Sequence, residues 1–122
     1  LSLDWMDPKE SWKWAGPNWN QFVNKTAVNG FRGVEIQSDD PKHMKDTWQS
    51  VLNIANEKVS DDQIDLDNTW IRFVKDEDGR GPGVSAFCLE ADDKEALINK
   101  ASDLGLMNNG NIFIGGVKFL LA

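Results

Sequence analysis

Six side chains able to bind or react with a small molecule lie on short segments in which apolar and polar residues alternate. They provide one carboxylate, one amide, two cationic groups, one indole and one thiol: Glu35, Gln37, Arg72, Lys118, Trp70 and Cys88. Successive side chains of a β-strand point to opposite faces of the sheet. The alternation therefore predicts that these polar groups share the face opposite the one that packs on helices.

The elements that must position these groups follow an order that occurs twice. Each copy begins with a strand, Phe31–Ser38 or Val84–Glu90, and ends with another, Trp70–Val74 or Val117–Leu121. Between the two strands each copy has an acidic pair, which is a helix N-cap signal, and then a helical pattern. The expected inner faces of the two helices are the stripes Met44, Trp48, Val51, Leu52, Ala55 and Leu97, Ile98, Ala101, Leu104. This order predicts an α+β domain with two helices on the outer side of the sheet.

The first 30 residues differ from the rest of the chain. They contain four of the six tryptophans, and neither a helical nor a strand period is evident in them. We divide the chain into a Trp-rich N-terminal arm, residues 1–30, and a domain, residues 31–122. The indoles are expected to pack on the domain or on a partner subunit, or alternatively to line a ligand site.

Composition excludes several classes of partner. The net charge of −7 argues against nucleic acid and anionic membranes as partners and favours neutral or cationic ligands. No apolar run reaches the roughly 20 residues that a membrane span needs. The start of the sequence does not resemble a secretory signal, and the single cysteine excludes an internal disulfide. We therefore expect a cytoplasmic protein.

Three local patterns resemble known sites and are given structural interpretations instead. The glycine-rich segment 79–83 leads into a strand and lacks the Lys-Ser/Thr of a phosphate loop, so it is expected to be a flexible connection. The aspartates between positions 61 and 67 lack the glycine and terminal glutamate of a calcium loop, so they are expected to form a solvated turn. His43 falls away from the apolar stripe of its helix and is expected to be solvated.

Four segments carry a resemblance to a known family: GVEIQSDDPKHMKDTWQSVL, IRFV, DGRGPGVSAFCLEADD and IFIGGVKFLL. In their order and spacing they resemble the vicinal oxygen chelate superfamily of glyoxalases, bleomycin resistance proteins and dioxygenases. WAGPNWNQF followed by GVEIQS is similar to an uncharacterised glyoxalase-like branch. The resemblance implies two βαβββ-type units that form a curved, mostly antiparallel sheet around a cavity. The second unit is short.

The same resemblance implies positions for metal ligands, and this chain lacks ligands there. Gly33 and Val84 match the first and third ligand positions, the fourth-strand carboxylate is missing, and the last strand offers only Lys118. These residues do not provide the donor groups that are needed to bind a metal ion. We therefore expect no metal and no other cofactor.

In such a fold Glu35, Gln37, Trp70, Arg72, Cys88 and Lys118 would lie on the concave side and form a small-molecule site. The alternative is that Glu35 and Arg72, on strands that the family makes neighbours, simply pair with each other. Cys88 is a weak candidate nucleophile, because His43 lies on an outer helix.

Three functional interpretations remain open, and whether the chain is an enzyme is uncertain. The first is a metal-independent small-molecule-binding domain whose ligand is a neutral or cationic aromatic compound. The second is a metal-independent lyase or isomerase that uses Glu35 as a base, although a carboxylate beside arginine is a weak base. The third is a non-catalytic structural half of a longer glyoxalase-like protein. A homodimer is expected, because the short second unit would leave an open sheet edge.

Overall fold

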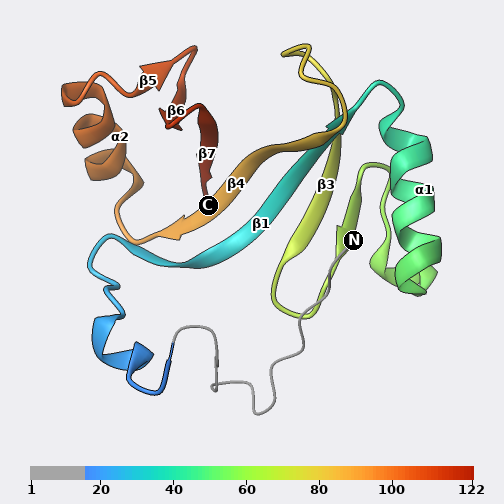
Figure 1. Ribbon diagram of the computed structural model, residues 1–122, viewed down its shortest axis with the longest axis horizontal. Helices are drawn as coiled ribbons and strands as arrows, with labels where there is room; N and C mark the ends of the chain where they lie inside the picture. The colour runs from blue at the N-terminus through green and yellow to red at the C-terminus, as the bar shows by residue number, and fades with distance from the viewer. Residues whose placement is uncertain (1–15) are drawn as a thin grey trace.

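The computed structural model describes residues 16–122, which form one mixed seven-stranded sheet and two α-helices (Figure 1). The strands are β1 (Val28–Ser38), β2 (Gln63–Asp65), β3 (Trp70–Lys75), β4 (Gly83–Ala91), β5 (Met107–Asn108), β6 (Asn111–Ile114) and β7 (Val117–Leu121). The helices are α1 (Pro41–Leu52) and α2 (Lys94–Asp103), with short 3₁₀ turns η2 (Trp19–Phe22) and η3 (Asn56–Lys58).

The sheet consists of two similar units joined along their first strands. Its strand order is β2-β3-β1-β4-β7-β6-β5. In each unit the first strand is parallel to the last, β1 to β3 and β4 to β7, and β1 pairs antiparallel with β4 at the centre. The remaining pairs, β2–β3, β5–β6 and β6–β7, are antiparallel. The predicted α+β repeat and curved, mostly antiparallel sheet are confirmed.

Both helices begin at the predicted acidic caps. The Asp40 carboxylate accepts a hydrogen bond of 3.0 Å from the backbone N–H of His43, and Pro41 occupies the first helical position. Asp93 caps α2 in the same way. Helix α1 ends at Asn53, whose left-handed φ of 53° directs its N–H back to the last turn. Local sequence signals thus set where each helix begins.

The core lies between α1 and the first unit of the sheet. Its buried members are Ile36, Ile64, Ile71 and Phe73, and half-buried residues pack around them: Val34, Met44, Trp48, Ile54, Val59 and Leu66. Val34 and Ile36 therefore face α1, as predicted. The expected α1 stripe was wrong at Val51, which is 66% exposed, and at Ala55, which is exposed and lies beyond the end of α1. It was only partly right at Trp48, which is half-buried. Val51 and Trp48 lie side by side at a shallow surface pocket.

The second unit has much less core than the first. Ala101 is the one buried residue of α2, whereas Ile98 and Leu104, predicted on its inner face, are 43% and 59% exposed. Figure 1 shows α2 beside β5 and β6, at the opposite side of the molecule from α1. A row of aromatic rings, Phe31, Phe87 and Phe119, crosses β1, β4 and β7 with centroids about 6 Å apart, and Phe31 is 49% exposed. This helix-side face of the second unit is incompletely covered.

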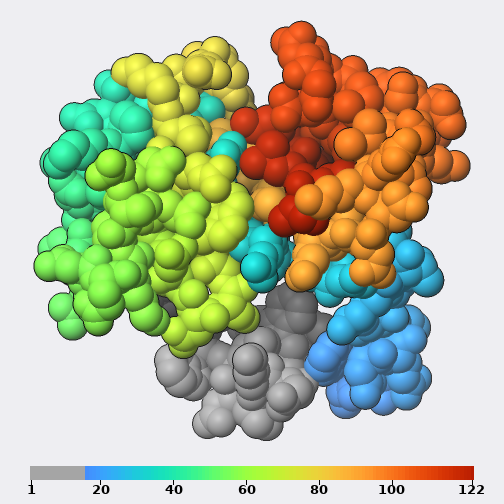
Figure 2. Space-filling view, turned by 180° about the vertical axis from the view of Figure 1, so that it is seen from behind, coloured from blue at the N-terminus to red at the C-terminus, as the bar shows by residue number. Residues whose placement is uncertain are grey.

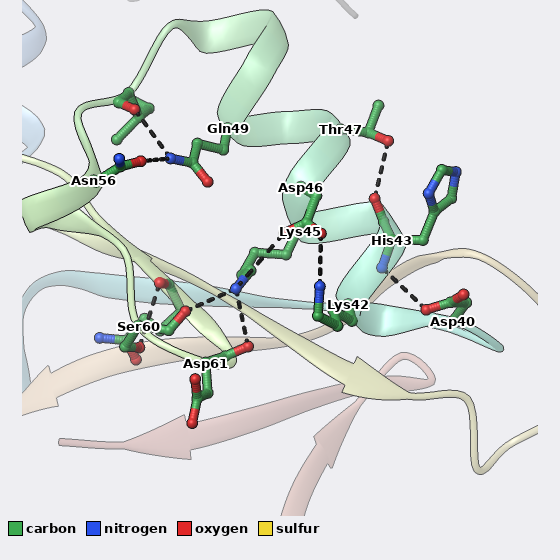
Figure 3. A network of polar contacts seen from close by, with 12 residues as sticks. Asp40, Lys42, His43, Lys45, Asp46, Thr47, Gln49, Asn56, Ser60 and Asp61 are labelled. Atoms are coloured by element: carbon green, nitrogen blue, oxygen red, sulfur yellow. Dashed lines mark hydrogen bonds and ion pairs between the residues drawn. The ribbon is translucent and has the colours of Figure 1, made fainter.

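A buried lysine fixes the turn that precedes β2 (Figure 3). The Lys45 side chain extends from α1 toward this turn. Its ammonium donates to the backbone oxygens of Ser60 at 2.9 Å and Asp61 at 3.2 Å, and lies 3.8 Å from the Asp46 carboxylate. Lys45 is 8% exposed. In the same view the His43 side chain points away from these contacts, and it is exposed as predicted.

Replacing Lys45 with methionine is expected to destabilise the fold by about 1–2 kcal/mol, because two backbone oxygens lose a charged donor while the apolar stem is kept. Urea unfolding measures the loss. Lys42→Met is the matched control, since Lys42 is an exposed neighbour whose ammonium binds Asp46 across one helical turn. We expect the control to be nearly neutral, and equal losses for the two variants would contradict the role of Lys45.

One predicted segment boundary needs correction. Strand β1 begins at Val28 rather than Phe31, so the last residues assigned to the Trp-rich arm belong to the sheet. Trp5, Trp12 and Trp14 of that arm lie outside the described residues. Between α1 and β2 the chain forms η3 and a single bridge between Val59 and Ile64.

No helix within residues 16–122 is long and apolar enough to cross a membrane.

Candidate functional site

The concave face is built from side chains that the strand register places in rows. Gly33, Glu35 and Gln37 of β1 lie beside Trp70, Arg72 and Val74 of β3. On the other side of β1, Glu35 is paired with Ala86 of β4, and Ala86 with Lys118 of β7. One row across the four central strands therefore reads Arg72, Glu35, Ala86, Lys118.

Two cations share the Glu35 carboxylate at the centre of this row. Oε1 of Glu35 lies 3.6 Å from an Arg72 guanidinium nitrogen, and Oε2 lies 3.2 Å from Nζ of Lys118. Glu35 is 8% exposed, so its charge is largely removed from water and needs such partners. Lys118 meets Glu35 across Ala86, whose methyl group leaves the space between them free. The pairing of Glu35 with Arg72 that the sequence offered as an alternative is present.

Trp70 and Arg72 form a stacked pair beside the row. The guanidinium carbon lies 4.6 Å from the centre of the indole, a cation–π distance, and two nitrogens of the guanidinium donate to Oε1 of Gln63 at 3.1 and 3.3 Å. The indole also lies against Gly33. A Cβ at position 33 would be 2.2 Å from the nearest ring atom, so this position admits only glycine unless Trp70 moves.

A cavity of about 640 Å³ opens on this face next to the ion-paired row. Its floor and walls include Glu35, Gln37, Ser85, Asn108, Phe113 and Lys118. In Figure 2, cyan atoms of β1 are visible between the yellow-green first unit and the red atoms of β7. A volume of this size matches pockets that hold small organic molecules.

The loop 76–82, which joins β3 to β4, forms one wall of the cavity and is held by its own side chains. Asp76 accepts backbone hydrogen bonds from Asp78, Gly79 and Gly81. Asp78 accepts from Gln37 Nε2 at 2.7 Å and from the Arg80 guanidinium at 2.8 Å, and these donors hold the pKa of its carboxyl far below the ordinary value. The loop predicted to be flexible is thus tied to β1 through Gln37.

Of the six predicted site residues, three line the cavity: Glu35, Gln37 and Lys118. Arg72 and Trp70 lie beside it and support Glu35. Cys88 is buried, paired in register with Gly33, and burial raises the pKa of its thiol, which opposes nucleophilic reactivity.

Sequence reasoning missed the opposite wall of the cavity. Asn108, Asn109 and Asn111 surround the tight turn between β5 and β6, and Phe113 stands beside Lys118 in the β6–β7 pair. The Asn-Asn-Gly-Asn run was assigned no functional role from the sequence. Its amides line the same cavity as residues of β1 and β3, which are distant in sequence, and no local pattern reports that.

No protein-family model and no curated protein matches the sequence. Among solved structures, the chain is similar to methylmalonyl-CoA epimerase from Mycobacterium tuberculosis, with a TM-score of 0.60 and 17% sequence identity over 81% of this chain and 90% of that chain. The two chains therefore share the same arrangement of strands and helices. This chain has a glyoxalase-like fold. At this level of identity the likeness concerns the fold alone.

Metal-dependent members of the superfamily that the sequence resembles would place a divalent ion on the concave face of this glyoxalase-like fold, so the fit of such an ion must be tested. The central row offers one carboxylate, Glu35, flanked by two cations whose charge opposes a metal ion. The residues at two of the ligand positions that the resemblance implies do not help. Gly33 lies against the Trp70 indole, and Val84 is paired with Ile36, which faces α1. Within residues 16–122 no three His, Cys, Asp or Glu side chains gather closely enough to bind a metal. These residues do not fit a metal ion, and no chemistry is derived through one.

Proposed function

We propose that this chain is a metal-independent domain that binds a small organic molecule in the concave cavity of its glyoxalase-like fold. The observation that carries the proposal is the cavity of about 640 Å³ next to the row of Arg72, Glu35 and Lys118. Two cations there flank the Glu35 carboxylate, and their charge opposes a metal ion at it. A ligand must then be recognised by protein groups directly.

The polar groups of the cavity are held in place before any ligand enters, which favours a binding role. Gln37 fixes the loop 76–82 by donating to Asp78 and to the backbone oxygen of Gly81. Ser85 donates to the backbone oxygen of Glu35 at 3.3 Å, at the point where β4 carries an extra residue relative to β1. A preformed site reduces the entropy lost on binding.

The enzymatic alternative through Glu35 receives less support. A general base must accept a proton from the substrate with a free carboxylate oxygen. Each oxygen of Glu35 already faces a cation, Oε1 the guanidinium of Arg72 and Oε2 the ammonium of Lys118. The structural half-domain is also less favoured, because both units contribute to one cavity.

The proposal is tested by titrating purified protein with small aromatic compounds and with zinc, nickel, iron and manganese salts. We expect compounds to raise the melting temperature and to shift the amide NMR signals of cavity residues such as Gln37 and Phe113. We expect the metals to do neither, and elemental analysis to find no stoichiometric metal. Close to one bound metal per chain would contradict metal independence, and compounds that bind only outside the cavity would contradict the site.

Substituting the cavity itself provides the matched comparison. Ser85→Leu fills the floor with an apolar side chain and is expected to abolish compound binding. Ser50→Leu, at an exposed position of α1 far from the lining residues, is the control and is expected to bind normally. Equal binding by both variants would contradict the cavity as the site.

We also propose that the protein is a homodimer, formed through the incompletely covered aromatic row Phe31, Phe87 and Phe119. The edge strands β2 and β5 have only three and two residues, so the apolar face supports association better than the sheet edges do. Light scattering at micromolar concentration is expected to give twice the chain mass of 13.7 kDa. Phe31→Asp should yield monomers, while Val51→Asp on exposed α1 should not. A monomeric wild-type protein would contradict the proposal.

A further inference from the structure

The charges of the row Arg72, Glu35 and Lys118 do not balance. Arg72 and Lys118 carry two positive charges, Glu35 carries one negative charge, and each cation contacts Glu35. At the rim, Asp78 is paired with Arg80 at 2.8 Å, which cancels those two charges. The remaining rim charges, Lys75 and Glu77, are of opposite sign. The row therefore has one cation more than its single carboxylate can neutralise.

Lys118 is the cation that can deliver this charge to a ligand. Its ammonium has three donor hydrogens, and within residues 16–122 its one charged partner is Glu35, at 3.2 Å. Lys118 remains 27% exposed and lines the cavity, whereas Arg72 is engaged by Gln63 and Trp70 outside the lining. Glu35 holds the ammonium over Ala86 and leaves donors of Lys118 available to the cavity.

The residues around Lys118 indicate which kind of molecule should carry an anionic group that binds Lys118. Phe113 is directly paired with Lys118 across β6 and β7, is half-buried, and lines the cavity. Val74 adds an apolar surface from β3, and Asn108 and Asn111 add amides from the hairpin. This combination suits a flat apolar body on Phe113 with polar substituents toward the amides.

We propose that the cavity binds an organic carboxylate, whose oxygens take the free donors of Lys118 and whose apolar body lies against Phe113. This proposal rests on the proposed small-molecule function of the same cavity. A monoanion matches the one excess positive charge of the row Arg72, Glu35 and Lys118, and a charge-assisted hydrogen bond in a partly desolvated site is stronger than a neutral one. The local charge of the row thus favours the opposite sign of ligand from the one that the net charge of the chain favours.

The test compares matched compounds that differ only in charge. Phenylacetate and 2-naphthylacetate are each titrated against their neutral primary amides and the corresponding amines, phenethylamine and 2-(2-naphthyl)ethylamine, with binding followed by amide NMR. We expect the carboxylates to bind at least tenfold more tightly than the amides and to shift the signals of Lys118, Phe113 and Asn108. Amides that bind as tightly as carboxylates, or amines that bind more tightly, would overturn the proposal.

Variants locate the effect at Lys118. Lys118→Met should remove the preference for the carboxylate over the amide, Lys118→Arg should keep most of it, and Lys94→Met at the exposed start of α2 should not change it. A preference that survives in folded Lys118→Met would overturn the proposal. If the Lys118→Met protein fails to fold, the comparison of carboxylate and amide binding by the wild-type protein still tests the proposal.

The same data separate the two proposals. If amides and amines shift cavity signals as strongly as carboxylates do, the small-molecule site stands and the carboxylate preference is wrong. If none of the six compounds shifts any cavity signal, both proposals fail for ligands of this class.

Discussion

Phe73→Ala is expected to destabilise the protein by about 3–5 kcal/mol, the loss typical of a large aromatic side chain removed from a core. Phe73 is 3% exposed and packs with Ile36, Ile64 and Ile71, and its ring meets the Trp48 ring edge-on with centroids 6.1 Å apart. Both α1 and the sheet surround it, so the cavity left by the truncation cannot collapse easily. Urea unfolding followed by circular dichroism measures the loss.

Phe119→Ala is the matched control for Phe73, because the two residues occupy equivalent positions in the last strands of the two units. Phe119 is only half-buried, and α2 has one buried residue. We expect it to cost about 1–2 kcal/mol less than Phe73→Ala, since Phe119 has less buried apolar area before truncation and its removal creates a smaller cavity. Equal losses would mean that the second unit is packed as well as the first.

The faces of the strands and the ends of the helices could be predicted from local sequence. Alternation alone assigned Val34 and Ile36 to α1 and Glu35 and Gln37 to the opposite face, and the acidic caps located both helices. These features depend on side-chain direction and on hydrogen bonds over three residues, which local sequence determines.

Burial depth could not be predicted in the same way. Trp48 was predicted on the inner face of α1, but it is only half-buried beside exposed Val51, whereas Phe73 of β3 is 3% exposed. Helical spacing shows which side of α1 faces the sheet, whereas the depth reached by each side chain depends on how α1 is set over β1 and β3. That placement results from packing between elements distant in sequence.

The site depends on register between strands, which the sequence does not display. Lys118 reaches Glu35 only because Ala86, one residue from the bulged Ser85, lies between them in the row. A shift of one residue in β4 or β7 would turn Lys118 to the helix side. The wall formed by loop 76–82 likewise depends on hydrogen bonds that Asp76 and Asp78 accept from backbone N–H groups, which a Gly-rich and Asp-rich composition does not specify.

Gly33→Ala is expected to destabilise the protein by about 2–3 kcal/mol, a cost typical of overpacking. The new Cβ would lie 2.2, 2.4 and 2.5 Å from three atoms of the Trp70 indole, far inside contact distance. The indole cannot simply retreat, because the Arg72 guanidinium lies 4.6 Å from its centre and is itself bound to Gln63 and Glu35. Gly30→Ala on the same strand is the control, since its Cβ would meet no atom closer than 3.6 Å.

A double-mutant cycle with Trp70→Ala identifies the cause of this loss. If the clash with the indole is responsible, Gly33→Ala should cost less than about 1 kcal/mol in the Trp70→Ala background, because the ring that it would strike is gone. A cost that stays at 2–3 kcal/mol in that background would place the strain in the β1 backbone instead.

The displacement of the Trp70 indole by Gly33→Ala should also weaken carboxylate binding at the cavity floor, because Trp70 supports Arg72 and Arg72 contacts Glu35. Gly30→Ala should leave this binding unchanged.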